Sequence, residues 1–178
     1  AAVMDYPNRK SIRLSGYDYR QCGLYFVTIC TYQKLMLFGK IQDGKSYLNP
    51  IGRIVREELL KTNLLRKDTG IQIAQAIIMP NHVHFIASFL EKDDIAYSEM
   101  EFERFSKPLA DSLSSVVRAL KSAVTKQIHA LYGTEYPYEK IWQSRYYEHI
   151  IRNDEELNQI ITYIQENPIR WENDYFYG

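Results

Sequence analysis

The sequence contains few cysteines, no long apolar run and no excess of charge of either sign. Its two cysteines, Cys22 and Cys30, have no CxxC spacing for zinc and are too few for a disulfide framework. No apolar run approaches the roughly 18–20 residues that a membrane-spanning helix needs, so we expect no association with a membrane. Because unpaired cysteines are typical of reducing compartments, we expect a cytoplasmic protein.

The composition is that of an ordinary folded protein. Of the 178 residues, 46% are apolar and 25% are charged, which excludes global disorder, collagen and coiled coil. The length predicts a single domain over residues 1–178. Lysine plus arginine and aspartate plus glutamate number 22 each, and this balance, taken alone, argues against a nucleic-acid-binding protein.

The charge is nevertheless unevenly distributed along the chain. Residues 91–111 hold seven acidic and three basic side chains, a net charge of −4 that leaves about +4 for the rest. We interpret residues 91–111 as an acidic insert and residues 1–22, which include Arg13, as a basic N-terminal arm. A solvated acidic loop without functional meaning explains the insert equally well.

Hydrophobic periodicity predicts the order β-α-β-β-α-β-α. The expected strands cover residues 24–32, 71–78, 82–89 and 141–152, and the expected helices cover residues 51–65, 112–131 and 154–167. Residues 91–108 are predicted to form an exposed loop. This order indicates an α+β fold, in which an antiparallel sheet of ferredoxin-like or RNA-recognition-like type carries its helices mainly on one face.

Two histidines, His82 and His84, open one of the predicted strands with Val83 between them. Side chains alternate between the faces of a strand, so the two imidazoles share one face, about 7 Å apart, and Val83 points to the other. Two imidazoles on one face can share a divalent metal. The alternative is a pair of histidines on a polar face of the sheet, and the pattern alone does not exclude it.

The last predicted helix brings Tyr163 and Asn167 together, because residues one turn apart meet on a helix surface. Glu156 lies on the same flank of the apolar stripe, and Asn153 with Glu156 forms a capping box at the start of the helix. A phenol beside a carboxamide could be a nucleophile beside a metal ligand. A tyrosine at the edge of the core and a polar asparagine near a helix end are the alternative.

Aromatic and basic residues alternate in the strand predicted at residues 141–152. Tyr147 and His149 share one face, and Arg145 and Arg152 flank it. This mixture suits base stacking together with phosphate contacts. His149 is either a further metal ligand or a hydrogen-bonded strand histidine.

The helix predicted at residues 112–131 has a polar edge that contains Arg118 and Lys121. Such an edge could follow the phosphate backbone of a nucleic acid. A solvated helix face explains these residues equally well.

Taken together, residues 79–84, 142–152 and 163–168 resemble the HUH single-tyrosine transposases of small insertion sequences. Within that superfamily they are most similar to the REP-associated tyrosine transposases, and the resemblance covers about residues 9–171. Asn167 stands where mobile relatives often carry glutamine. Both side chains offer a carbonyl oxygen, so the role of metal ligand is retained.

The resemblance implies an HUH-type fold and a metal-dependent enzyme that cleaves and rejoins single-stranded DNA. His82, His84 and Asn167 would hold Mg²⁺ or Mn²⁺. Tyr163 would attack the scissile phosphate and give a 5′-phosphotyrosine and a free 3′-OH. Because a tyrosine has a pKa near 10, the phenol needs a proton acceptor, and His149, Glu156 or a metal-bound hydroxide are the candidates.

The implied partner is hairpin DNA with a single-stranded region, bound by a monomer, with a homodimer as the alternative. No nucleotide cofactor is expected. Arg13, Arg118 and Lys121 are the expected contacts to this DNA, with Arg145 and Arg152 beside them. Two other functions remain open at this point. One is a non-catalytic module that binds single-stranded nucleic acid, and the other is a metal-dependent phosphodiesterase without a covalent intermediate.

Overall fold

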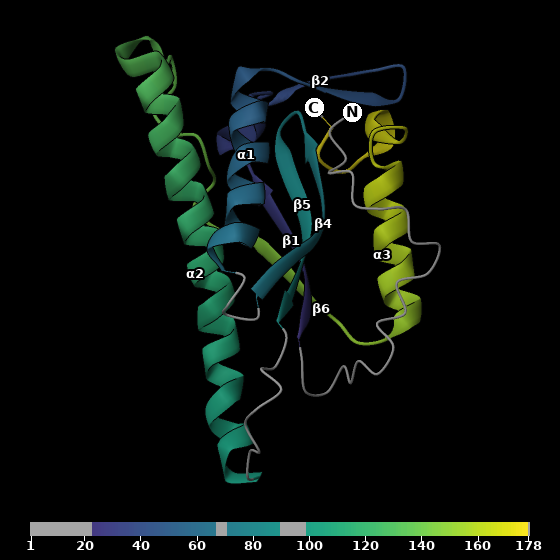
Figure 1. Cartoon of the computed structure of the whole chain (residues 1–178). Helices are drawn as coiled ribbons and strands as arrows, with labels where there is room; N and C mark the ends of the chain where they lie inside the picture. The colour runs from purple at the N-terminus through teal and green to yellow at the C-terminus, as the bar shows by residue number, and fades with distance from the viewer. Residues whose placement is uncertain (1–22, 67–70, 90–98, 178) are drawn as a thin grey trace.

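The computed structural model describes residues 23–66, 71–89 and 99–177, the last range without the side chains of residues 99–112. Its centre is a four-stranded antiparallel sheet in the order β4-β5-β1-β6. The strands are β1 (Leu24–Cys30), β4 (Ile71–Met79), β5 (His82–Phe89) and β6 (Tyr147–Ile151). Helices α1 (Pro50–Leu65) and α2 (Glu99–Tyr132) cover one face of the sheet, and α3 (Asp154–Glu166) covers the other (Figure 1). The predicted α+β class is confirmed.

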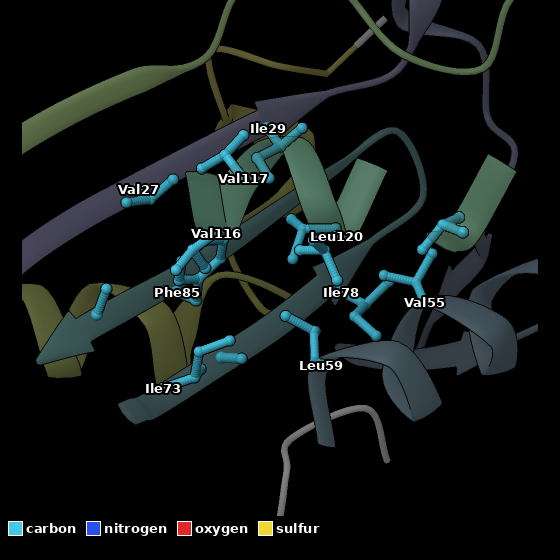
Figure 2. Close-up of a cluster of buried hydrophobic side chains, with 14 of the residues drawn as sticks. Val27, Ile29, Val55, Leu59, Ile73, Ile78, Phe85, Val116, Val117 and Leu120 are labelled. Carbon is cyan, nitrogen blue, oxygen red and sulfur yellow. The ribbon is translucent and has the colours of Figure 1, made fainter. Parts of the chain in front are cut away.

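The sheet separates two apolar cores. The larger core lies between the sheet and helices α1 and α2, and it contains Phe85 of β5, Leu59 of α1 and Leu120 of α2 (Figure 2). The smaller core lies under α3 and contains Ile86 of β5. Because side chains alternate along a strand, the odd-numbered residues of β5 face α1 and α2, whereas His82 and the other even-numbered residues face α3.

Both α1 and α3 begin where the sequence predicts, because each has an asparagine cap. The side chain of Asn49 accepts a hydrogen bond from the backbone N–H of Gly52 at 2.9 Å, and Pro50 takes the first helical position. The side chain of Asn153 accepts a hydrogen bond from the backbone N–H of Glu156 at 2.8 Å. The caps fix the start of each helix and thereby the rotation of its side chains.

The start of α2 differs from the sequence prediction. The helix begins at Glu99, so the exposed loop expected at residues 91–108 is wrong for residues 99–108. Acidity suggested a solvated loop, but glutamate, methionine, arginine and lysine in this stretch are good helix formers. Residues 91–98, which belong to the same predicted loop and to the acidic insert, lie outside the described part of the chain.

The strand expected at residues 141–152 is shorter than predicted, because β6 begins at Tyr147. The preceding segment packs on α2 instead: Ile141 and Trp142 are buried in the larger core, and the Trp142 indole N–H donates to the carbonyl of Lys121 at 3.2 Å. The segment keeps one isolated β-bridge, which joins Trp142 to Thr31. Burial of the indole against the helix therefore prevails over the β propensity of the segment.

A hairpin of β2 (Gly39–Gln42) and β3 (Lys45–Leu48) was not predicted. Asp43 and Gly44 form its turn, both with positive φ (50° and 67°), and Asp-Gly is a strong signal for such turns.

The basic arm at residues 1–22, with Arg13, lies outside the described residues. Among the residues that are described, no helix has both the length and the apolar character required to cross a membrane.

Candidate functional site

The two histidines of β5 lie side by side beneath α3, with ring centroids 4.5 Å apart. Both are buried, with 0% exposure for His82 and 1% for His84. The Nδ1 atom of His82 is 2.8 Å from Asn81 Oδ1, and that of His84 is 2.7 Å from Thr28 Oγ1. In both rings, Nδ1 therefore has a hydrogen-bond partner in β1 or in the turn between β4 and β5, and Nε2 is the nitrogen that faces α3.

Burial keeps both imidazoles neutral. It lowers the pKa of His82 to about 4, although the nearby Asp174 carboxylate and the Asn167 side chain oppose the shift. It also lowers the pKa of His84 well below its usual value, and the neighbouring His82 adds to this effect. A neutral imidazole has a free lone pair, which is the form that binds a metal.

Helix α3 presents Tyr163 and Asn167 to this pair of histidines. The Tyr163 hydroxyl lies 3.4 Å from His84 Nε2, and its ring contacts the ring of Phe26 edge to face at 6.1 Å. Asn167 follows the last residue of α3 and is 1% exposed. The sequence prediction that the two histidines, Tyr163 and Asn167 meet on the α3 face of the sheet agrees with this geometry.

Sequence reasoning missed a further member of the site, Asp174. Its carboxylate Oδ2 accepts hydrogen bonds from the Tyr163 hydroxyl at 3.2 Å and from the Asn167 amide at 2.6 Å, and Oδ1 accepts from the backbone N–H of Phe176 at 2.8 Å. Burial, reinforced by this carboxylate, raises the pKa of Tyr163 to about 12. Asp174 lies in an irregular segment after the last helix, where no periodicity indicates which residues it approaches.

The segment that carries Asp174 covers the site with aromatic rings. The centroid of Phe176 lies 4.4 Å from that of His82 and 5.7 Å from that of His84. The ring of Trp171 also lies near His82, with its centroid 5.9 Å from that of the imidazole. These rings, together with α3, account for the complete burial of the two histidines.

The donor atoms fit a divalent metal. Two buried side-chain atoms at the site, His82 Nε2 and Asn167 Oδ1, have no hydrogen-bond partner in the described part of the protein, and buried polar atoms are rarely left in this state. With His84 Nε2 they provide two imidazole nitrogens and one carbonyl oxygen, a set that suits Mn²⁺ and is compatible with Mg²⁺. No group of three His, Cys, Asp or Glu side chains that could hold a metal occurs among the described residues. A metal bound to His82 and His84 would therefore take the Asn167 amide as its third protein ligand.

The two predicted proton acceptors, His149 and Glu156, lie apart from this site. They form an ion pair with each other where β6 leads into α3, and Glu156 also accepts a hydrogen bond from the backbone N–H of Arg152 at 2.8 Å. These contacts lower the pKa of Glu156. Glu156 precedes Tyr163 by seven residues, which corresponds to about 10 Å along a helix.

The predicted DNA contacts lie on the other side of the sheet or at its edge. Arg118 and Lys121 line a shallow groove of about 620 Å³ on α2, together with Ser122, Thr125, Lys126 and His129. The Lys121 ammonium donates to the carbonyls of Gln143 at 2.8 Å and Arg145 at 3.5 Å. Arg145 is thereby tied to α2, and Arg152 follows the edge strand β6. Arg13 lies outside the described residues, and no contact between Tyr163 and any of the four other predicted residues is found in the described part of the chain.

Comparisons with known proteins concern the sequence and the fold as a whole. No model of a protein family matches the sequence. An uncharacterized protein of Haemophilus influenzae is 37% identical over 174 residues, which cover 96% of this chain and 93% of that protein. A second H. influenzae protein, named provisionally as a REP-associated tyrosine transposase, is 28% identical over 159 residues, 86% of this chain and 74% of that protein.

An Escherichia coli K12 protein named REP-associated tyrosine transposase is 27% identical over 118 residues, 66% of this chain and 54% of its own length. Among solved structures, a REP-associated tyrosine transposase bound to a REP hairpin matches 84% of this chain and 68% of that protein, with a TM-score of 0.53 and 24% identity. This structural match concerns the fold. In sequence, the chain is therefore a homologue of proteins named REP-associated tyrosine transposases, and it shares their fold.

Proposed function

We propose that the protein cleaves and rejoins single-stranded DNA through a covalent bond to Tyr163, with a divalent metal at His82, His84 and Asn167. The observation that carries this proposal is the convergence of a phenol with three potential ligands from β5 and α3. Two of those ligand atoms, His82 Nε2 and Asn167 Oδ1, are buried without a partner. Burying two polar atoms without a partner is unfavourable, and a metal bound between them would satisfy both atoms.

The metal would be Mg²⁺ or Mn²⁺, and its chemistry is to polarise the scissile phosphate and balance its charge. The protein supplies the rest of the site. Burial keeps the two imidazoles neutral and therefore available as ligands. The ring of Phe26 supports both the His84 ring, at 5.1 Å, and the Tyr163 ring, at 6.1 Å, so the nucleophile is held against the ligands.

In the cleavage step, Tyr163 Oη forms a bond to phosphorus and the bond from phosphorus to O3′ breaks. The phenol releases one proton and the departing O3′ takes up one, so the products are a 5′-phosphotyrosine and a 3′-OH. In the protein without DNA the phenol donates to Asp174 Oδ2, and neither His149 nor Glu156 is as close. Attack by a 3′-OH on the phosphotyrosine reverses both bond changes and joins strands without a nucleotide cofactor.

DNA whose phosphate reaches the two histidines must displace the segment that follows α3. Phe176 and Trp171 cover the histidines, and Asp174 holds the phenol. A phosphate could not share this space with the Asp174 carboxylate, since both are negatively charged. Displacement would also expose Tyr163 to solvent, which removes the main cause of its raised pKa, namely burial.

The proposed DNA partner is a hairpin with a single-stranded flank, and the solved relative bound to a REP hairpin supports the hairpin part of this proposal. The groove on α2 is lined by basic and neutral side chains without an acidic one, which suits a phosphate backbone. Tyr147 on the edge strand β6 is 59% exposed and pairs with Thr28, the residue that contacts His84. A strand that leaves the α2 groove past Arg145 would therefore meet Tyr147 before Tyr163, and the exposed ring could stack on a base.

The test uses one hairpin oligonucleotide with a single-stranded flank, labelled at either end, in Mn²⁺ or in EDTA. A covalent 5′-phosphotyrosine retains the 3′ label on the protein in a denaturing gel, while the 5′ label appears on a shorter free strand. His82→Ala should abolish both products while the fold is retained. Cleavage without a protein-bound label would support the phosphodiesterase instead, and binding without cleavage would support the non-catalytic module.

A further inference from the structure

We propose that Asn81 is a positioning residue that fixes the proton of the His82 ring on Nδ1 and so directs the Nε2 lone pair toward Asn167. Asn81 is 1% exposed and immediately precedes His82, at the turn between β4 and β5. The proton position follows from the hydrogen bonds of this side chain and holds for the protein without metal. Only its consequence for metal binding rests on the proposed function.

The orientation of the Asn81 amide is determined by its surroundings. Its Nδ2 group donates to the backbone carbonyl of Phe176 at 2.8 Å and lies 3.4 Å from that of Lys34. If the amide were turned over, its oxygen would face two carbonyl oxygens and no donor. Oδ1 must therefore be the atom that faces His82 Nδ1, 2.8 Å away.

An amide oxygen can only accept a hydrogen bond, so His82 Nδ1 must donate. At pH 8, even a histidine with an ordinary pKa is neutral and has a single ring proton. That proton is on Nδ1, which leaves Nε2 as an unprotonated acceptor. Nε2 has no hydrogen-bond partner among the described residues, which agrees with an unprotonated nitrogen whose lone pair is available to bind a cation.

The partner of His84 Nδ1 imposes no such constraint. This Nδ1 atom faces the hydroxyl of Thr28 at 2.7 Å, and a hydroxyl can donate or accept. The two histidines are therefore not equivalent: Asn81 commits His82 to one tautomer, whereas Thr28 permits both for His84. Partners in the second shell of this kind change metal affinity by 10–100-fold when they are removed.

The tautomer can be observed directly in the metal-free protein. Long-range ¹H–¹⁵N NMR spectra at pH 8 distinguish a protonated Nδ1 from a protonated Nε2, and the chain has four histidines, of which His82 is assigned by the loss of its signals in His82→Gln. We expect the Nδ1–H pattern for His82 in the unaltered protein. An Nε2–H pattern, or a mixture of the two, would overturn the proposal, and this result needs no variant of Asn81 to fold.

Two variants then separate the acceptor from the donor of Asn81. Asn81→Asp keeps an acceptor for Nδ1–H and should keep the tautomer, although it loses the donor to Phe176. Asn81→Leu has a similar size and no acceptor, so the tautomer should become mixed and the Kd for Mn²⁺ should rise 10–100-fold. Ser46→Ala is the matched control, since the Ser46 hydroxyl is buried and donates a hydrogen bond to the carbonyl of Ile78. This variant should change neither the tautomer of His82 nor the Kd for Mn²⁺.

The outcomes for the tautomer and for the proposed function are distinguishable. If His82 has the Nδ1–H pattern but Mn²⁺ does not bind, Asn81 has the role proposed here and the metal-dependent function fails. If Mn²⁺ binds equally well to the unaltered protein and to a folded Asn81→Leu protein, the positioning role is refuted while the metal site stands.

Discussion

Replacing Tyr163 with phenylalanine removes one oxygen and keeps the ring. The ring contacts with Phe26, at 6.1 Å, and with His84, at 5.3 Å, are retained. The hydroxyl loses long hydrogen bonds to Asp174 at 3.2 Å and to His84 at 3.4 Å, while Asp174 keeps its bonds to Asn167 and to the backbone of Phe176. Hydrogen bonds of this length contribute little, so the free energy of unfolding should fall by about 1 kcal/mol.

A loss of that size corresponds to a decrease in Tm of about 2–4 °C for a chain of this length, measurable by circular dichroism. The covalent adduct should disappear completely, because no other atom of the residue can form the bond to phosphorus. Affinity for the hairpin should remain within a few-fold of its original value. The assay is the denaturing gel with 3′-labelled hairpin DNA, which counts protein-bound label.

Tyr147→Phe is the matched control, because it makes the same chemical change on a residue that is 59% exposed on β6. This variant should still form the adduct. An adduct in Tyr163→Phe would refute the assignment and transfer the role to Tyr146 or Tyr147. Cleavage by Tyr163→Phe without an adduct would mean that water is the nucleophile. Loss of folding, visible as a much larger change in Tm, would refute the stability estimate.

The remaining predictions concern charge, pH and metal. Arg118→Gln combined with Lys126→Gln should reduce the slope of log K against log salt by about 1.4, since each phosphate contact to a single strand contributes about 0.7; an unchanged slope would exclude the α2 groove. Burial lowers the pKa of His82 from 6.5 to about 4. Between pH 6.5 and pH 4, His82 is therefore protonated in the unfolded chain but neutral in the folded chain. The free energy of unfolding should therefore fall by about 3 kcal/mol from pH 6.5 to pH 4, and urea titrations of His82→Gln should show a weaker pH dependence. Mn²⁺ at 100 times its Kd should stabilise the protein by about 2.7 kcal/mol, an effect that Asn167→Ala should largely remove in thermal melts. His149→Gln should form the adduct at the original rate, because His149 pairs with Glu156 away from Tyr163.

Regular spacing explains which parts of the site could be predicted from the sequence. His82 and His84 differ by two residues on a strand, and Tyr163 and Asn167 differ by four on a helix, so each pair shares a face whatever the rest of the fold does. The apolar stripes then determined which face of the helix meets the sheet. These local rules predict each pair, whereas the meeting of the two pairs was implied by the resemblance to the HUH transposases.

Composition was a poorer guide than periodicity. The acidity of residues 99–108 suggested a loop, but charge does not prevent a helix when the residues are good helix formers, and α2 begins at Glu99. The aromatic residues at positions 141–146 suggested a strand, but the Trp142 ring is buried against α2. The Asp43-Gly44 turn was a local signal that the sequence did contain, and its positive φ angles identify the hairpin of β2 and β3.

Asp174 and Asn81 could not have been assigned in this way, because their contacts depend on where separate segments meet in space. Asp174 reaches Tyr163 and Asn167 only because the chain turns back over α3 through Trp171. The same turn brings the carbonyl of Phe176 to the Asn81 amide, 95 residues away in sequence, and so orients the oxygen that faces His82. One long-range contact therefore connects the segment that covers the site with the proton position of a proposed metal ligand. A spacing rule predicts which side chains share a surface, but the protonation and hydrogen bonding of those side chains depend on what packs against that surface.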